Sequence, residues 1–266
     1  MNKQTALITG ASSGIGLALS ALFAREGYDL LMISQNEDRL HTAANRLQQQ
    51  YRQVKIHCLP KDLSLPSSPQ EIYAYTKEHS ITVDILVNNA GIQVYGSFHE
   101  KELSDYMRLM AVNTNALVAL TGLFVKDMCA RKSGRILNIG STGAFSPCPL
   151  NAVYCASKAF VLHFSEAIAE ELDGTGVTVT TLCPGATKTN FARRAGIEHT
   201  RMFSGSTMEA DQVAMLGYRA LMRGNPVMVA GLRNKLLVGS IRLSPRKLVV
   251  KMGKGLMQSS KKRDKS

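Results

Sequence analysis

The sequence has little of what several protein classes require. It contains no tryptophan, and aromatic residues make up only 6% of its 266 residues. Its five cysteines form no CxxC pair and are odd in number, which is typical of a reduced protein rather than of a disulfide scaffold. No uninterrupted apolar run reaches the roughly 18 residues of a membrane-spanning helix. No basic segment followed by a long apolar stretch opens the chain, so we expect no signal peptide and a cytoplasmic location.

Metal-binding patterns are also missing. The six histidines show neither HExxH nor another metal spacing, so the sequence predicts no metal site. The net charge of +12 is typical of nucleic-acid-binding proteins, but eleven of the 32 lysines and arginines lie in residues 231–266, against one acid, Asp264. Because this basic tail has no aromatic residue to stack on bases, we expect no nucleic-acid partner.

Short apolar runs alternate with longer helical patterns along the chain. The expected strands are residues 5–9, 29–34, 54–59, 83–88, 135–140, 177–183 and 227–229. The expected helices are residues 15–25, 37–50, 69–79, 105–131, 152–172 and 209–222. Several of the short runs, such as ALIT and DILVN, are apolar almost throughout, as in strands covered on both faces. The pattern predicts an α/β fold, a doubly wound Rossmann-like parallel sheet of about seven strands with helices on both faces.

A glycine-rich loop, TGASSGIG at residues 9–16, follows the first expected strand and opens the first expected helix. Gly10 permits a sharp exit from the strand, and Gly14 and Gly16 let the helix N-terminus approach a pyrophosphate. A glycine loop alone could be an ordinary turn between a strand and a helix. Its position after a strand, together with the motifs downstream, favours a dinucleotide-binding site.

Tyr154 and Lys158 are four residues apart and therefore share one face of a helix. Taken alone, such a pair is usually a solvated surface pair. A free phenol titrates near pH ~10, and we expect the neighbouring ammonium to lower that pKa. Tyr154 would then give a proton to a carbonyl oxygen in reduction, or take one from an alcohol in oxidation. Ser141, just after an expected strand, could hydrogen-bond the same oxygen.

Together these motifs resemble the single-domain branch of the short-chain dehydrogenase/reductase family, from Thr5 to about Val229. The other matching pieces are Asp62 in KDLS, NNAG at residues 88–91, Asn113, YCASK at residues 154–158 and PGATKT at residues 184–189. The resemblance implies a catalytic tetrad of Asn113, Ser141, Tyr154 and Lys158. In that tetrad Lys158 would bind the nicotinamide ribose, and Asn113 would hold a water in a proton relay.

The resemblance also implies how the cofactor is held. Asp62 and Leu63 would meet the adenine, residues 89–91 the adenine-side ribose, and Thr187 and Thr189 the carboxamide. The full set of expected cofactor contacts is Gly10, Ser12, Ser13, Gly14, Ile15, Gly16, Ser34, Gln35, Asp62, Leu63, Asn89, Ala90, Gly91, Tyr154, Lys158, Pro184, Gly185, Thr187 and Thr189.

The end of the second expected strand bears on the choice of cofactor. An acidic residue there would bind the ribose 2′-hydroxyl and repel a 2′-phosphate. Ser34, Gln35 and Asn36 stand there instead, so the sequence favours NADP over NAD. The basic residues that NADP-using relatives often carry where Gln35 and Ser13 stand are missing. Ser34, Gln35 and Arg39 would have to hold the phosphate with fewer charges.

The predicted protein is thus an NAD(P)-dependent oxidoreductase, an NADPH-dependent reductase of a ketone, aldehyde or 3-oxoacyl substrate. Residues 1–230 would form a single dinucleotide-binding and catalytic domain, and residues 231–266 a basic amphipathic C-terminal extension. By resemblance we expect a homodimer or homotetramer formed through the helices near residues 116–131 and 152–172. The alternative is a non-catalytic protein on the same fold that senses cofactor or binds an anionic surface. The intact tetrad counts against it.

Two segments leave alternatives open. Residues 187–207, expected to cover the substrate, hold four lysines and arginines against one acid, Glu198. They indicate either a preference for an anionic substrate or a solvated loop. Residues 231–254 interleave leucines with basic residues, and Pro245 divides them. They could lie on an anionic membrane, or pack over the substrate cleft or a partner subunit. Residues 259–266 are expected to be disordered.

Overall fold

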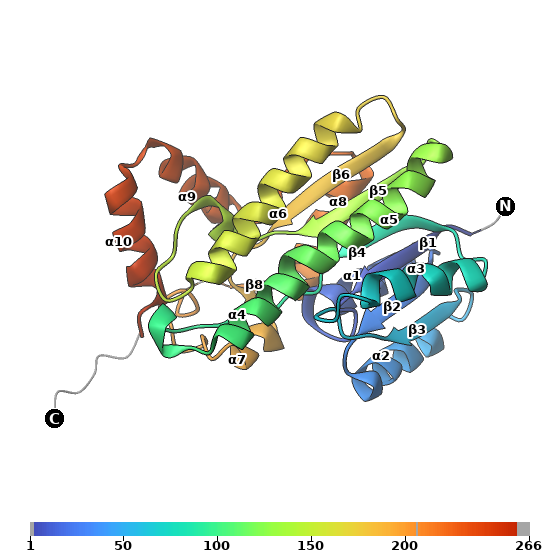
Figure 1. Cartoon of the computed structure of the whole chain (residues 1–266), viewed down its shortest axis with the longest axis horizontal. Coiled ribbons are helices and arrows are strands. Elements are labelled where there is room, and N and C mark those ends of the chain that lie inside the picture. Colours follow the sequence, from blue (N-terminus) through green and yellow to red (C-terminus); the bar gives the residue numbers. More distant parts are fainter. Residues whose placement is uncertain (1–2, 206, 260–266) are drawn as a thin grey trace.

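The centre of the computed structural model, which describes residues 3–205 and 207–259, is a parallel sheet of seven strands (Figure 1). The strand order is β3-β2-β1-β4-β5-β6-β9, and every neighbouring pair is parallel. The strands are β1 (Thr5–Thr9), β2 (Asp29–Ser34), β3 (Ile56–Pro60), β4 (Val83–Asn88), β5 (Gly134–Ile139), β6 (Val177–Cys183) and β9 (Val227–Val229). This is the Rossmann-like sheet that the sequence predicts.

Helices cover both faces of the sheet, as Figure 1 shows. One face carries α1 (Gly14–Arg25), α2 (Glu37–Gln50) and α8 (Ala210–Met222), and the other carries α3 (Ser68–Glu78), α5 (Ala116–Ala130) and α6 (Ala152–Glu171). Neighbouring residues of β1 illustrate the arrangement, because Ile8 belongs to the first core and Leu7 to the second, both fully buried. Burial on both sides explains why these strands read as continuous apolar runs.

The expected helix at residues 105–131 is interrupted in the structure. α4 (Leu103–Met110) passes into a π-helical turn, Ala111–Asn115, before α5 begins. Other boundaries shift by up to two residues, since β3 begins at Ile56 and β5 at Gly134. Several short elements were not predicted from the sequence. Residues 187–207, called the lid below, and the residues directly after them form β7 (Thr187–Lys188), α7 (Asn190–Arg194) and β8 (Met208–Glu209). The 3₁₀ turns Phe98–Glu100 and Thr142–Phe145 were also missed.

The same stretch, Leu103–Ala130, is the one helical segment among the described residues that is long and apolar enough to cross a membrane by length and composition. Half of its most apolar window is buried inside the structure, because α5 packs on the sheet. The core helix of an α/β domain has the same properties. Asn113 and Asn115 interrupt its apolar residues, which is why no continuous run stands out in the sequence.

The C-terminal extension forms two helices, α9 (Leu232–Leu243) and α10 (Arg246–Met257), which meet at Pro245. In Figure 1 they lie at one end of the molecule, apart from the helices that cover the sheet. Ser259, within the stretch expected to be disordered, pairs with Thr200 in an isolated bridge. The rest of that stretch, residues 260–266, and Ser206 of the lid lie outside the described residues.

Candidate active site

The site is built around the point where the strand order reverses, between β1 and β4. The chain leaves these two strands toward opposite sides, which opens a crevice at their carboxyl ends. Asn89 fastens the two loops together, because its side-chain amide donates to the Thr9 carbonyl oxygen at 2.8 Å. The backbone N–H groups of Asn89 and Ala90 donate to Thr9 Oγ1 at 2.9 and 3.0 Å. The glycine loop and the NNAG loop thus form one rigid floor.

The glycines of this floor are held at close quarters. A Cβ on Gly16 would collide with the Gly10 carbonyl oxygen, and one on Gly14 would lie 3.1 Å from the Thr189 side chain. Gly10 and Gly14 also have positive φ values of 64° and 56°, which favour glycine. The result is a narrow cradle of backbone at the N-terminus of α1, where a pyrophosphate fits by charge and by size.

A cavity of about 700 Å³ begins at this cradle and ends under α9 and α10. Every predicted cofactor residue lines it except Gly16, which packs against Gly10. Of the predicted tetrad, Ser141, Tyr154 and Lys158 line it as well, and Asn113 lies behind the wall. The structure therefore brings together residues from the carboxyl ends of six strands, β1 to β6, as the crevice of a doubly wound sheet requires.

The reacting centre lies between the two halves of this cavity. Tyr154 and Lys158 project from α6, and the Ser141 and Tyr154 hydroxyls are hydrogen-bonded to each other. Ser141 Oγ also accepts from the Gly143 N–H at 3.0 Å, which orients the serine side chain. Lys158 Nζ donates to the Ile139 carbonyl oxygen at 2.7 Å and lies 5.8 Å from the centre of the Tyr154 ring.

The titration of these groups differs from the sequence-based expectation. Burial raises the pKa of the Tyr154 phenol well above its ordinary value, and the hydrogen bond with Ser141 opposes that shift only in part. The lowering of the phenol pKa that we expected from the Lys158 ammonium is not seen in this structure, where desolvation is the largest influence on the phenol. Burial likewise lowers the pKa of Lys158, from 10.5 to about 8.

Asn113 contributes from the π-helical turn between α4 and α5. Its Oδ1 accepts from the Ile92 N–H at 2.9 Å, and its Nδ2 donates to the Ile92 carbonyl oxygen at 3.0 Å and to Ser157 Oγ at 3.1 Å. The side chain is 1% exposed, so these bonds form in a dry environment. Asn113 thus holds the loop after β4 against α6, and its role in a water relay stays a prediction.

The adenosine end of the crevice contains two arginines that the sequence did not single out as cofactor ligands. Ser34 Oγ lies 2.7 Å from Ser12 Oγ, and Gln35 Nε2 donates to the Asp62 carboxylate at 2.8 Å. Arg108, on α4, donates to Gln35 Oε1 at 3.1 Å. Arg194, on α7, also lines the cavity. Both lie far from the glycine loop in the sequence, so no local motif could reveal them.

The substrate end is walled by the lid and by the C-terminal helices. Tyr95 donates through its hydroxyl to the Met257 carbonyl oxygen at 2.7 Å, and the Cys148 thiol to the Gly253 carbonyl oxygen at 3.4 Å. A Cβ on Gly253 would lie 2.8 Å from the Pro147 carbonyl oxygen, so α10 is packed closely on this wall. Of the open alternatives for the tail, the structure places its inner faces over the cleft. Apolar side chains dominate this end of the cavity, namely Phe191, Ala195, Ile197, Met202, Phe203, Leu237, Ile241, Val249, Met252 and Leu256.

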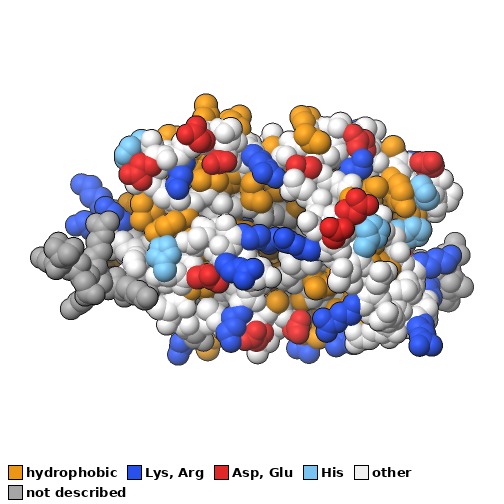
Figure 2. All heavy atoms as spheres, turned by 90° about the horizontal axis from the view of Figure 1, so that it is seen from below, with side chains coloured by type: hydrophobic (Ala, Val, Ile, Leu, Met, Phe, Trp, Pro, Cys, Tyr) orange, Lys and Arg blue, Asp and Glu red, His pale blue; other side chains and the backbone are white. Residues whose placement is uncertain are grey.

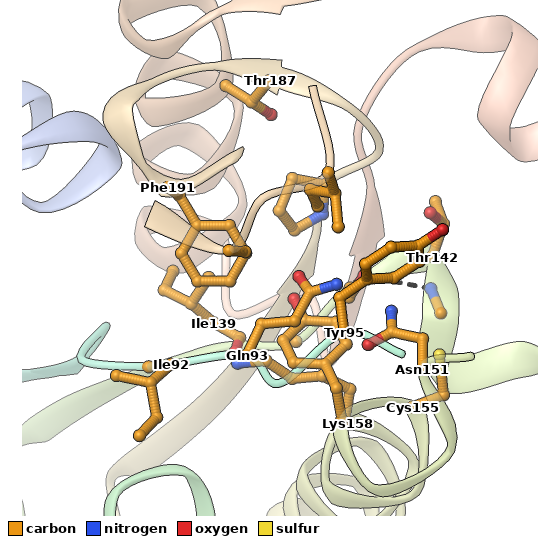
Figure 3. Close-up of a pocket in the computed structure, with 18 of the residues that line it drawn as sticks. Ile92, Gln93, Tyr95, Ile139, Thr142, Asn151, Cys155, Lys158, Thr187 and Phe191 are labelled. Atoms are coloured by element: carbon orange, nitrogen blue, oxygen red, sulfur yellow. Dashed lines mark hydrogen bonds between the residues drawn. The ribbon is translucent and has the colours of Figure 1, made fainter. Parts of the chain in front are cut away.

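Figure 3 shows how the two ends face each other. Phe191 and Thr187, from the lid, lie across the cavity from Lys158 and Cys155 on α6, and Tyr95 and Gln93 project into the space between. The Cys155 and Cys148 thiols are hydrogen-bonded to each other in the wall. In the described ranges no group of three or more His, Cys, Asp or Glu side chains could hold a metal ion.

Comparison with known proteins identifies the family. The family model described as short chain dehydrogenase matches residues 4–199. The chain belongs to this family. It is therefore an NAD(P)-dependent oxidoreductase, and its relatives do not favour the non-catalytic alternative.

Individual relatives agree with this assignment. The short-chain dehydrogenase from Sphingobium yanoikuyae in complex with NADPH is 30% identical, with a TM-score of 0.81 over 99% of this chain and 98% of that chain. The bulky-bulky ketone specific alcohol dehydrogenase from Comamonas testosteroni is 28% identical, with a TM-score of 0.77 over 91% and 93%. The ketoacyl reductase HetN of Nostoc sp. is 28% identical over 250 residues, which are 91% of this chain and 86% of that protein.

Proposed function

We propose that this short-chain dehydrogenase is an NADPH-dependent reductase of a ketone, aldehyde or 3-oxoacyl group on a largely apolar substrate. The observation that carries the proposal is the position of Tyr154. Its phenol, beside Ser141, stands where the phosphate-binding crevice meets the apolar half of the cavity. A phenol at that junction can give its proton to a carbonyl oxygen as hydride reaches the carbonyl carbon.

The residues would divide the work as follows. When bound, the nicotinamide supplies the hydride that reduces the carbonyl carbon. Tyr154 gives its phenolic proton to the carbonyl oxygen, and Ser141 donates a hydrogen bond to the same oxygen, which stabilises the charge that develops there. Lys158 places a positive charge close to Tyr154 and so stabilises the phenolate that the proton leaves behind. Apolar walls exclude water from the reacting atoms.

The preference for NADPH rests on the surroundings of Ser34. Ser34, Gln35 and Asn36 at the end of β2 carry no carboxylate, and Gln35 is hydrogen-bonded to Asp62 and Arg108. Arg194 lines the cavity, and partial burial, followed by the charge of Arg39, lowers the pKa of its guanidinium. Neither arginine forms an ion pair within the part of the chain that the structure describes. Two cations that form no ion pair suit a phosphate.

Two relatives support the substrate class. The Nostoc protein is named a ketoacyl reductase, and the Comamonas enzyme is described as specific for bulky-bulky ketones. The apolar lining from α7, α9 and α10 suits a ketone or acyl chain with large apolar substituents. We place the enzyme in the cytoplasm as a homodimer or homotetramer formed through α5 and α6, where Phe160 is 43% exposed. Sedimentation velocity tests the assembly, and a monomer would contradict it.

The test is oxidation of NADPH with a panel of apolar ketones, aldehydes and 3-oxoacyl thioesters, with the Tyr154→Phe variant alongside. We expect turnover of at least one class, and a loss of at least ~100-fold in the variant because its ring keeps the packing but has no proton to give. NADPH binding, followed by fluorescence, should be retained. Turnover by the variant within a few-fold of the unmodified enzyme would exclude Tyr154 as the acid.

A further inference from the structure

The outer faces of α9 and α10 are unusually apolar for solvent-exposed helices. The inner faces are buried through Val238 on α9 and through Val249, Gly253 and Met257 on α10. The outer faces still carry Leu232, Leu236, Leu243, Leu248, Met252 and Leu256, with exposed fractions of 74%, 67%, 90%, 49%, 46% and 38%. On α9, Leu232, Leu236 and Leu243 recur at spacings of four and seven residues and so share one helix face. Nothing in the fold of this chain requires leucines there.

The same two helices carry a strong positive charge. Residues 231–259 hold seven lysines and arginines and no acid, namely Arg233, Lys235, Arg242, Arg246, Lys247, Lys251 and Lys254. None of the seven forms an ion pair in the described part of the chain. Figure 2 shows hydrophobic and basic side chains side by side at the end of the molecule where α9 and α10 lie. Leucines flanked by unpaired cations are typical of helices that lie in the interface of an anionic membrane.

The exposed apolar surface continues into the substrate cavity. Met252 and Leu256 are both partly exposed and part of the cavity lining. Leu237, which follows Leu236 directly, and Ile241, two residues before Leu243, line the same cavity from α9. The substrate end of the cavity therefore adjoins the apolar and basic surface.

The charge of the surface distinguishes between possible occupants. In a symmetric dimer formed through this face, the seven cations would meet the same seven cations of the second copy, which is repulsive. A nucleic acid would satisfy the cations but would leave the exposed leucines in water, and α9 and α10 offer no aromatic side chain for stacking. An anionic bilayer satisfies both kinds of side chain at once.

We propose that the outer faces of α9 and α10 dock this enzyme on an anionic lipid bilayer, with the substrate end of the cavity next to the membrane. The leucines enter the boundary between headgroups and acyl chains, and the basic side chains contact lipid phosphates. The docking concerns a surface outside the reacting centre, so it holds or fails independently of the carbonyl reductase activity.

The experiment is co-sedimentation of the full-length protein with vesicles of phosphatidylglycerol and phosphatidylcholine, at low and at high salt, with pure phosphatidylcholine vesicles as the reference. Two variants remove the two contributions separately, Leu236→Ser with Leu243→Ser, and Arg242→Glu with Lys247→Glu. A matched control, Leu65→Ser with Leu103→Ser, changes leucines that are 55% and 69% exposed elsewhere on the molecule. All of these side chains are exposed, so thermal melting should confirm that each variant is folded.

We expect binding to anionic vesicles at low salt and release as salt rises. The charge variant should partition at least about 30-fold less, since each basic residue near the surface contributes about 1 kcal/mol. The leucine variant should partition onto the anionic vesicles at least about tenfold less, and the control should bind like the unmodified protein. Absence of binding to the anionic vesicles, or unchanged binding of the leucine variant, would overturn the proposal. A second result would also overturn it: the unmodified protein does not bind the vesicles, and the leucine variant loses an oligomer that the unmodified protein forms. The exposed face would then join two copies of the chain.

Discussion

The buried charge of Lys158 should lower the free energy of unfolding of this enzyme, compared with a variant that has an uncharged side chain at this position. The residue is 5% exposed, and burial lowers the pKa of its ammonium from 10.5 to about 8. A shift of that size means that the native state holds the charge at a cost of about 3 kcal/mol relative to the unfolded chain. Replacing Lys158 with Met removes the charge and keeps most of the side-chain volume. It also removes the hydrogen bond to Ile139, which contributes about 1 kcal/mol.

The pH dependence gives this prediction its sign. Because the pKa is lower in the folded state, the unfolded chain binds more protons between pH 8 and 10.5, and stability rises with pH across that window. Below pH 8 both states are protonated and the cost is fully present. Lys158→Met should therefore be about 2 kcal/mol more stable than the unmodified enzyme near neutral pH. The advantage should fall between pH 8 and 10.5 and be lost above pH 10.5, where the lysine becomes neutral in the unfolded chain as well.

Urea unfolding, followed by circular dichroism at several pH values, measures the difference. Lys126→Met is the matched control, because Lys126 is exposed on α5 and its replacement should change stability little. A Lys158→Met variant that is less stable near neutral pH, or whose advantage does not change with pH, would refute the reasoning. Carbonyl reduction should be largely lost in the same variant, which would show that the buried cation serves function at the expense of stability.

Two further predictions concern the cofactor. Ser34→Asp places a carboxylate at the end of β2, so it should weaken NADPH binding through charge repulsion and favour NADH, and equilibrium titration of both cofactors checks the reversal. If the unmodified enzyme binds NADH more tightly than NADPH, the assignment of NADP is wrong. Arg194→Ala should weaken NADPH binding about tenfold and NADH binding much less, because only NADPH carries the 2′-phosphate. Equal losses for the two cofactors would place Arg194 at a phosphate that both share, or outside the site.

The cofactor half of the site could be predicted because its motifs are local. The loop at residues 9–16 contains its own strand exit and helix start, and the spacing of Tyr154 and Lys158 places both on one face of α6. The structure brings these groups to one cavity as expected. The pKa of Tyr154 could not be predicted the same way, because desolvation depends on how many groups surround the phenol in three dimensions.

Arg108 and the π-helical turn could not be predicted from the sequence for a second reason. The sequence between residues 105 and 131 has one helical periodicity, so nothing in it marks the extra residue per turn at Ala111–Asn115. Yet that turn places Asn113 against Ile92 and Ser157, and α4 ahead of it brings Arg108 to Gln35. The contact between Arg108 and Gln35 joins residues 73 positions apart, which no local pattern encodes.

The substrate half depends on even longer connections, and this has a consequence for specificity. Tyr95 holds the Met257 carbonyl oxygen across 162 positions, and Cys148 holds that of Gly253 across 105. These contacts place the wall from α10 on the cavity without using any residue of the cofactor crevice. Substitutions in α10 can therefore reshape the substrate end while the cradle and the reacting centre stay unchanged. Because α9 and α10 line the cavity and also expose leucines and cations to solvent, one short segment of the chain contributes both to substrate specificity and to the proposed docking on a membrane.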